Sequence, residues 1–198
     1  EETLGVNSRA QLASSEKILR RRKNEELMAA GVTLMDPDTT YVDADVVVGR
    51  DTILYPGTWL EGATVIGESS LIGPQVRFQN VKVGANVTAH FCYAHECEIA
   101  DGVTLGPYVH IRPDTKLAAG VKIGNFVEVK NSSVGEGTKL PHLSYIGDAD
   151  IGAGVNMGCG TITVNYDGRE KFRTQVGDGA FVGCNANLVA PVRVGDNA

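Results

Sequence analysis

Two cations in the middle of the chain, Arg112 and Lys130, have a spacing that could support chemistry. Each directly follows a large aliphatic residue, Ile111 or Val129, and the two are separated by eighteen residues. If the chain winds with an eighteen-residue period, both side chains occupy the same corner of adjacent turns. Like charges about 5 Å apart repel each other, and a bound anion such as phosphate would offset the repulsion. We therefore expect an anion-binding corner here.

Further polar residues are expected close to this corner. By the same count, Tyr145 and Gly147 reach it one turn later, and Asn165 follows after another turn. His142 and Asn156 are expected on another face, roughly one turn apart. This part of the chain therefore combines a cationic corner with a histidine and several amides.

The element that must position these side chains is a six-residue repeat between about residues 46 and 197. A large apolar residue marks each repeat at Val48, Leu54, Leu60, Ile66, Ile72, Phe78, Ile99, Leu105, Ile111, Leu117, Ile123, Val129, Val176, Val182, Leu188 and Val194. A period of six fits neither a helix nor simple strand alternation, and strands of a β-sandwich recur every 8–12 residues. The pattern is typical of a hexapeptide solenoid.

In such a solenoid, three hexapeptides form one triangular turn, and the turns stack as parallel strands about 4.8 Å apart. The large apolar residue points inward and the next residue, often glycine, turns the corner. Glycine suits that corner because it tolerates backbone angles that other residues resist. We predict a parallel β-helix.

The repeat is interrupted between Thr163 and Val176, where the step is thirteen residues. Steps of five also occur, from Phe78, Val129 and Ile146. The long step indicates an inserted loop over residues 164–172, whose Lys171 could fold back toward the cations. Loops that leave a rigid scaffold often carry function, and a tolerated insertion is the alternative.

Residues 1–41 lie outside the repeat. Ser8 to Gln11 form a capping-box pattern that predicts a helix start, and Gly31 predicts its end. The apolar side of this helix is expected to contain Leu12, Ile18, Leu19, Leu27 and Met28. The basic cluster over residues 17–23 is expected to be a solvated helix face.

Composition limits the classes of partner. The net charge of −6 gives no support to general nucleic-acid binding, and no apolar run approaches the roughly 20 residues of a membrane span. The four cysteines form no C-x-x-C motif, so reduced thiols in a cytoplasmic protein are expected. The chain does not begin with Met, which leaves open a segment removed from its start.

Several longer motifs resemble one bacterial family. They are Ile111–Pro113, Gly124–Lys130, Pro141–Ala149, Asn156–Thr161, Asn165–Gly168 and Lys171–Phe172. Together they are similar to the acetyltransferase half of the bifunctional N-acetylglucosamine-1-phosphate uridyltransferase / glucosamine-1-phosphate N-acetyltransferase, over essentially the whole chain. The resemblance implies that the β-helix is left-handed, that the protein is a trimer, and that each active site lies between subunits.

The resemblance also implies a reaction, in which acetyl passes from acetyl-CoA to the amine of glucosamine 1-phosphate. The product would serve UDP-N-acetylglucosamine and cell-envelope synthesis. His142 matches the general base, and imidazole titrates near working pH. The matching substrate positions are Arg112, Lys130 and Lys171 for the phosphate and Tyr145 and Asn156 for the sugar; the acetyl-CoA positions are Cys159, Asn165, Tyr166 and Cys184. Transfer would be direct, through a tetrahedral intermediate whose oxyanion needs hydrogen-bond donors.

The two ends of the chain carry further implications of the resemblance. Residues 1–41 match the end of the nucleotidyltransferase domain and a helical linker arm, and residues 42–198 match the β-helix domain. Asn7 matches a magnesium-binding position, but the rest of that domain is absent, so no uridyltransferase activity is expected. The chain stops in mid-repeat at Ala198, whereas the family continues with residues that contact acetyl-CoA. A protein ending there is expected to bind glucosamine 1-phosphate but to bind acetyl-CoA poorly.

Other interpretations remain at this stage. The family more often has small or hydroxylated residues where Cys159 and Cys184 stand, so these thiols are either small fillers or, near a thioester, acyl acceptors. For His110 a structural role is expected. His90 and His95 have H-x4-H spacing, which allows a trimeric β-helix zinc enzyme of the carbonic-anhydrase type. A non-catalytic trimeric scaffold is the third class.

Overall fold

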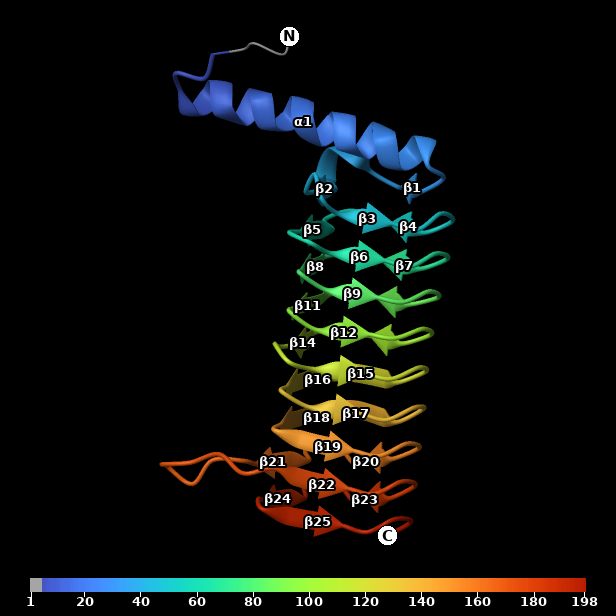
Figure 1. Ribbon diagram of the computed structural model, residues 1–198, viewed down its shortest axis with the longest axis vertical. Helices are drawn as coiled ribbons and strands as arrows, with labels where there is room; N and C mark the ends of the chain where they lie inside the picture. Colours follow the sequence, from blue (N-terminus) through green and yellow to red (C-terminus); the bar gives the residue numbers. More distant parts are fainter. Residues whose placement is uncertain (1–4) are drawn as a thin grey trace.

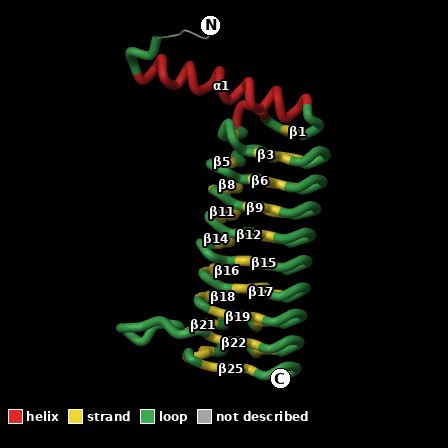
Figure 2. Tube along the Cα trace, in the orientation of Figure 1, coloured by secondary structure: helices red, strands yellow, loops and turns green. Residues whose placement is uncertain are grey.

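The computed structural model describes residues 5–198, and these form a long stack of triangular turns with one helix across its end (Figure 1). All strand pairings between turns are parallel. The protein is a left-handed parallel β-helix of hexapeptide repeats preceded by a helical arm, which confirms the predicted fold. Figure 2 shows how short each strand is and how regularly the corners separate them. No helix among residues 5–198 has both the length and the apolar character needed to cross a membrane.

The strands line three faces. The first face contains β1 (Thr33–Leu34), β4 (Ile53–Leu54), β7 (Leu71–Ile72), β10 (Thr88–Ala89), β13 (Thr104–Leu105), β20 (Asn156–Met157) and β23 (Phe181–Val182). The second contains β2 (Tyr41–Val42), β5 (Trp59–Glu61), β8 (Val76–Gln79), β11 (Cys92–His95), β14 (Val109–Ile111), β21 (Ile162–Val164) and β24 (Asn187–Val189). The long strands β16 (Lys122–Lys130) and β18 (Lys139–Gly147) bend round the corner between these two faces and join them into one sheet.

The third face forms a separate nine-stranded sheet. It contains β3 (Val47–Val48), β6 (Val65–Ile66), β9 (Lys82–Val83), β12 (Glu98–Ile99), β15 (Lys116–Leu117), β17 (Ser133–Val134), β19 (Ala149–Ile151), β22 (Thr174–Val176) and β25 (Val192–Val194). Strand β1 already pairs with β4, so paired turns begin at Thr33, ahead of the boundary expected at residue 42. A short 3-10 turn, η1 (Pro37–Thr39), connects β1 to β2.

The helix α1 (Arg9–Ala29) starts where the capping pattern predicts. The Ser8 hydroxyl accepts a hydrogen bond from the Gln11 backbone N–H at 3.2 Å. The Gln11 side-chain oxygen accepts from the backbone N–H of Asn7, one residue before the cap. At the other end Gly31 has a φ of +95°, which a residue without Cβ adopts most readily.

The predicted apolar side of α1 is wrong for most of its residues. Of the five, only Leu27 is buried, while Leu12 and Leu19 are 58% and 62% exposed. The helix crosses the end of the stack, and its N-terminal part extends beyond it (Figure 1), so only its C-terminal part meets the first turns. The second buried residue of the helix is Asn24, whose amide donates to the carbonyls of Pro37 and Thr40.

The basic cluster of α1 is solvated only in part. Lys17 and Arg21 are exposed as expected. Arg20 instead lies over the ring of Tyr41, with its guanidinium carbon 4.3 Å from the ring centre, and Tyr41 stacks on Trp59. This cation–π contact helps to dock the helix on the second face.

The core follows the repeat closely. Fourteen of the sixteen predicted inward residues are buried, and Leu188 and Val194 in the last turns are partly buried. A second inward position, two residues earlier, holds small or β-branched residues, and many are buried Thr or Ser such as Thr52 and Thr58. Most of their hydroxyls bond to backbone carbonyls, as Thr58 does to Tyr55 at 2.7 Å, which satisfies these polar atoms inside the core. The buried hydroxyl of Thr174 has no partner among the described residues.

The residue that turns the chain at most corners is not the predicted one, which was the residue directly after the inward apolar residue. Gly67, directly after Ile66, does not have positive φ; a Cβ there would lie 2.5 Å from the carbonyl carbon of Gly84 on the next turn. At most corners the left-handed residue comes two or three positions after the inward residue, as Gly137 does with φ +66°. Gly73 and Gly106 are exceptions: they directly follow the inward residue and have φ of +103° and +116°. Glycine after the inward residue is therefore selected mostly by the close approach of the next turn.

These two roles of glycine predict different costs of substitution. Gly67→Ala should lower the free energy of unfolding by about 3 kcal/mol, because the new methyl group overlaps backbone that cannot move freely. Gly137→Ala, where nothing lies within 4 Å of the new Cβ, should cost only about 1 kcal/mol for the left-handed backbone. Denaturant unfolding of both variants measures this difference, and equal losses would contradict it.

Candidate functional site

The cationic corner predicted from the sequence exists at the edge between the second and third faces. Ile111 pairs with Val129, so Arg112 and Lys130 lie side by side on adjacent turns, and Lys130 pairs with Gly147 on the next. Lys171 from the inserted loop lies close enough to Lys130 to affect its pKa. The pKa of Lys130 is lowered by this contact first, then by partial burial. Like charges held together in this way favour anion binding.

Two carboxylates that the sequence argument did not single out lie beside these cations. Glu128 accepts from the Arg112 guanidinium at 2.7 Å, with both side chains partly exposed. Asp148 is buried and lies close enough to Lys130 to raise its pKa, against the effect of Lys171. The eighteen-residue spacing between His110 and Glu128, which pair on adjacent turns, could have indicated from the sequence that Glu128 lies near this corner.

Tyr145 lies between the two edges of the second face. It pairs with Glu128 on the turn before and with Ile162 on the turn after. Its hydroxyl would be 2.4 Å from a Cβ placed on Gly147, so the ring leans toward the cationic corner. The absence of a side chain at Gly147 is thus needed for this packing. The backbone of Tyr145 does not lie at the corner, but its side chain extends toward it.

His142 lies at the opposite edge of the second face, where β18 turns from the first face. Its side chain is exposed, and its carbonyl accepts from the Ser144 hydroxyl at 2.8 Å. It pairs with Asn125 on the turn before. Gly147, next to Lys130, is five residues further along the chain, at most about 17 Å of extended backbone. Within one copy of the chain, the histidine and the cationic corner therefore lie at opposite edges of the second face.

Asn156 lies one turn after His142, as expected, but it is not in register with His142. Asn156 pairs with Lys139 and Phe181 on the first face, three residues before the position above His142. This turn has only seventeen residues because of the five-residue step after Ile146, so the residue in register with His142 is Cys159. The Cys159 carbonyl accepts from the Asn185 N–H at 2.7 Å, which places Cys184 at the same corner one turn later.

The four residues matched to acetyl-CoA are divided between the two edges. Cys159 and Cys184 are free thiols at the His142 edge, half-buried and exposed respectively. Asn165 and Tyr166 are at the base of the inserted loop, beside the cationic corner. A single copy does not bring the four together.

The inserted loop leaves the stack as a narrow projection (Figure 1). Its base is closed by an antiparallel bridge between Tyr166 and Lys171 and by a 2.9 Å bond from the Phe172 N–H to the Asn165 carbonyl. At its tip, the Asp167 carboxylate accepts from two backbone N–H groups, of Glu170 and Arg169, and this lowers its pKa. The loop is therefore held by its own hydrogen bonds and presents Lys171 at its base.

An aromatic and histidine stack occupies the second face above the cationic corner. The Tyr93 ring lies 5.1 Å from that of His110 and 5.0 Å from that of His95. Nε2 of His110 is buried, and no described residue is its hydrogen-bond partner. Burial lowers the pKa of His110; Glu128 opposes the shift, and His95 adds to it. The stack fits the structural role expected for His110.

Metal ligation finds little support among residues 5–198. No three His, Cys, Asp or Glu side chains gather there closely enough to hold an ion. His90 and His95 lie at opposite edges of the second face, so within one chain they cannot share one ion. Asn7 offers a single amide, whereas magnesium takes six oxygen ligands. The described residues around Asn7 do not form a magnesium site by themselves.

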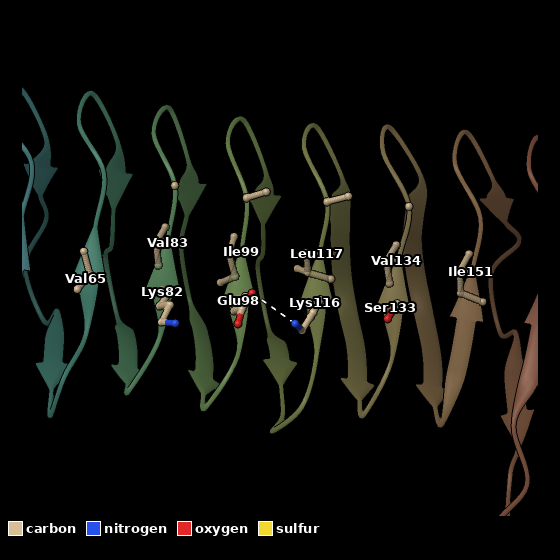
Figure 3. A pocket seen from close by; sticks show the side chains of 14 residues that line it. Val65, Lys82, Val83, Glu98, Ile99, Lys116, Leu117, Ser133, Val134 and Ile151 are labelled. Atoms are coloured by element: carbon tan, nitrogen blue, oxygen red, sulfur yellow. Dashed lines mark ion pairs between the residues drawn. The ribbon is translucent and has the colours of Figure 1, made fainter.

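A prominent hollow among the described residues lies away from this site. A shallow groove of about 710 Å³ runs along the third face, lined by residues that include Val83, Ile99 and Leu117 (Figure 3). A smaller one of about 410 Å³ lies on the second face between Phe126, Glu128 and Tyr145. We favour the second as the reactive region because it lies between the histidine and the cations, whereas the groove's charged residues Glu98 and Lys116 pair with each other.

Comparison with known proteins agrees with this geometry. Residues 96–131 match the family described as bacterial transferase hexapeptide (six repeats). The acyltransferase structure of UDP-N-acetylglucosamine O-acyltransferase (LpxA) from Moraxella catarrhalis matches 76% of this chain and 65% of its own, with a TM-score of 0.51 and 14% identity. At that identity the likeness shows the fold alone. The chain is thus a hexapeptide-repeat β-helix protein.

A closer relationship follows from sequence. Over all 198 residues the chain is 55% identical to the bifunctional protein GlmU of Geobacillus sp. strain WCH70 and covers 43% of that protein. It is 53% identical over 197 residues to GlmU of Carboxydothermus hydrogenoformans and covers 44% of it. The chain is a homologue of the GlmU proteins along its full length and corresponds to their C-terminal part, as the motifs predicted. It spans less than half the length of these relatives.

The shifted pKa of His110 predicts a sensitivity to acid. In the folded protein this pKa lies below the ordinary value of about 6.5, so the unfolded chain takes up the proton first as pH falls. Stability should therefore be complete above about pH 6.5 and decline below it. His110→Phe, which keeps a ring in the stack, should reduce the drop in melting temperature between pH 7 and pH 5.5. An unchanged drop would show that other groups cause the acid sensitivity.

Proposed function

We propose that this chain is an acetyltransferase that moves acetyl from acetyl-CoA to the amine of glucosamine 1-phosphate. The product, N-acetylglucosamine 1-phosphate, would supply UDP-N-acetylglucosamine for cell-envelope synthesis. The observation that carries the proposal is the cluster of Arg112, Lys130 and Lys171 at one corner, in a homologue of the GlmU proteins. A cytoplasmic location belongs to the same proposal, because its donor is acetyl-CoA and its cysteines are free thiols.

The phosphate explains why three cations are held together. Arg112 offers a planar fork of donors suited to phosphate oxygens, and the two lysines add point charges. Glu128 holds the guanidinium in place in the free protein. A dianionic phosphate would relieve the repulsion between Lys130 and Lys171, so these residues bind the acid end of the substrate.

His142 is the general base in this proposal. The amine must be neutral to attack a thioester, and an imidazole can take the proton that the amine loses as the new bond forms. Tyr145 and Asn156 contact the sugar, and Cys159, Asn165, Tyr166 and Cys184 contact acetyl-CoA. Transfer is direct: the C–N bond forms, the tetrahedral intermediate collapses, and the thiolate of CoA leaves and takes up a proton. Nothing in this sequence of steps requires a metal, and magnesium would serve only a uridyltransferase half.

The distance between the two edges supports a homotrimer with shared sites. The amine and phosphate of glucosamine 1-phosphate are on neighbouring ring carbons, so base and cations must meet around one sugar. Within one copy, His142 and the cationic corner lie at opposite edges of the second face. A neighbouring copy that packs against this edge can bring its own cationic corner to His142.

An exposed apolar ladder marks the surface on which that copy would pack. Phe91, Tyr108, Phe126 and Leu143 follow one another on successive turns at the His142 edge, and Tyr108 stacks on Phe126 at 5.1 Å. Three of the four are about 60% exposed. All four have left-handed φ, between +42° and +59°, which is costly for residues with a Cβ. Exposed apolar side chains on a strained corner favour an interface over a free surface.

The function is tested by acetyl transfer on this chain, followed as release of the CoA thiol. Glucosamine 1-phosphate should be a far better acceptor than glucosamine, and Arg112→Ala should remove most of that preference, because it deletes a charge-assisted contact of about 1.5–3 kcal/mol. A mutant that discriminates as well as the original protein would assign the cationic corner to another ligand. No transfer to either acceptor would refute the proposed reaction for this chain.

The role of His142 predicts a selective loss. His142→Ala should lower turnover by about 10²-fold or more, while calorimetry should find glucosamine 1-phosphate bound as before. His90→Ala changes a histidine at the same edge, three turns earlier, and is the matched control. Turnover equal to that of the original protein would rule out His142 as the base.

The ladder predicts the assembly. Light scattering should give a particle of about three times 21.0 kDa, and Phe126→Asp should dissociate it and abolish transfer, because a charge on this surface cannot be desolvated cheaply. Val47→Asp places the same charge on an equally exposed residue of the third face and should leave the trimer intact. A fully active monomer would contradict the shared site.

A further inference from the structure

Asp148 stands at the corner where the chain passes from the second face to the third. It is 4% exposed and has a φ of +50°. Asn80 and Glu96 turn the same corner on earlier turns and are exposed. A carboxylate is costly to bury unless it is hydrogen-bonded, so the different environment of Asp148 calls for a local reason.

The hydrogen bonds of this carboxylate join three turns. One oxygen accepts from the side-chain amide of Asn131, on the turn before. The other accepts from the side-chain amide of Asn165, on the turn after. Asn165 is the residue at which the inserted loop leaves the stack, so the carboxylate is bonded to the start of the loop.

The backbone of Asp148 holds the other end of the loop. Its carbonyl accepts from the N–H of Thr174 at 3.1 Å, where the chain rejoins the stack as β22. Its own N–H donates to the carbonyl of Lys130 at 3.0 Å. Asp148 therefore contacts both ends of the loop and one of the phosphate-binding lysines through its backbone.

The hydrogen bonds of the loop connect Asp148 to the cations. The Asn165 carbonyl accepts from the Phe172 N–H, and Tyr166 forms an antiparallel bridge with Lys171. The residue fixed by Asp148 is therefore bonded directly to the returning segment of the loop, which carries Lys171. Lys171 in turn lies beside Lys130. A shift at Asn165 would therefore move Lys171 relative to Lys130.

We propose that Asp148 is a positioning residue that fixes both ends of the inserted loop and thereby holds Lys171 beside Lys130 at the anion-binding corner. Its expected effect on catalysis rests on the proposed function, since the anion is then the phosphate of glucosamine 1-phosphate. It acts through Lys171 and touches no reacting atom.

Asp148→Asn tests this because an amide is of equal size but presents donors where the carboxylate accepted. The KM for glucosamine 1-phosphate should rise about tenfold, with kcat within about twofold. Lys171→Met should raise the same KM, and adding Asp148→Asn to it should have less than about a twofold further effect. Equal, additive effects of Asp148→Asn in both backgrounds would overturn the proposal. Asp101→Asn, which changes a corner carboxylate bonded to the Ala85 N–H, should leave the KM unchanged.

Hydrogen exchange gives a readout that does not depend on activity. In Asp148→Asn the amides of Phe172 and Thr174 should exchange at least about tenfold faster. The Gly84 amide, which is hydrogen-bonded to the Ile99 carbonyl on turns far from the loop, should exchange at an unchanged rate. Loop amides that exchange as in the original protein would overturn the proposal. If Asp148→Asn does not fold, Asn165→Ala leaves the carboxylate in place and should produce the same faster exchange at Phe172.

The two hypotheses can fail separately. If the original chain transfers no acetyl to glucosamine 1-phosphate, the proposed function fails. The exchange experiment, with calorimetry of inorganic phosphate as the probe of the corner, then still decides the role of Asp148. Unchanged exchange together with unchanged phosphate binding in Asp148→Asn would refute that role whichever substrate the protein uses.

Discussion

The parallel stacking of turns is the constraint on which the rest of this structure depends. Each residue lies about 4.8 Å from its counterpart on the next turn, and backbone hydrogen bonds hold that register along the stack. Inside, the register produces ladders of apolar side chains such as Phe78, Ala94 and Ile111. At the corners it brings backbone so close that Gly67 has no room for a Cβ.

The same register decides where charges can be tolerated. On the third face, Lys82, Glu98 and Lys116 follow one another with alternating sign, and Lys116 pairs with Glu98 (Figure 3). On the second face, Arg77 pairs with Glu61 across one turn. The corner with Arg112, Lys130 and Lys171 breaks this alternation, since Glu128 and Asp148 flank it without separating the cations. That departure distinguishes this corner from the other charged surfaces described above.

The triangular cross-section explains why a single copy leaves its candidate site open. A β-helix places functional side chains on flat faces and sharp edges, and it has no concave interior, because ladders of side chains fill its core. His142 and the cationic corner occupy two edges of one face, and the exposed ladder from Phe91 to Leu143 runs along the first of them. A pocket on such a scaffold needs something that projects from it, either the loop that carries Lys171 or a second copy.

Much of this fold could be read from the chain because its order is local and periodic. The six-residue step identified the β-helix and sixteen inward residues, all of them buried or partly buried. Ser8 and Gln11 marked the helix start, and the eighteen-residue step placed Arg112 beside Lys130. The family motifs led to the GlmU relatives.

Other features were decided only by the tertiary structure. They depend on contacts between turns and on small changes in the number of residues per turn. A single five-residue step brought Cys159 instead of Gly160 into register with His142, and Asn156 lies three residues before that position. The exposure of Leu12 and Leu19 depended on where the helix crosses the stack, and the glycines after inward residues on how closely two turns approach. The environments of Glu128 and Asp148 depended on side chains one turn away and on the inserted loop. No periodicity encodes these contacts, because a period fixes the path of the backbone and not the partners of each side chain.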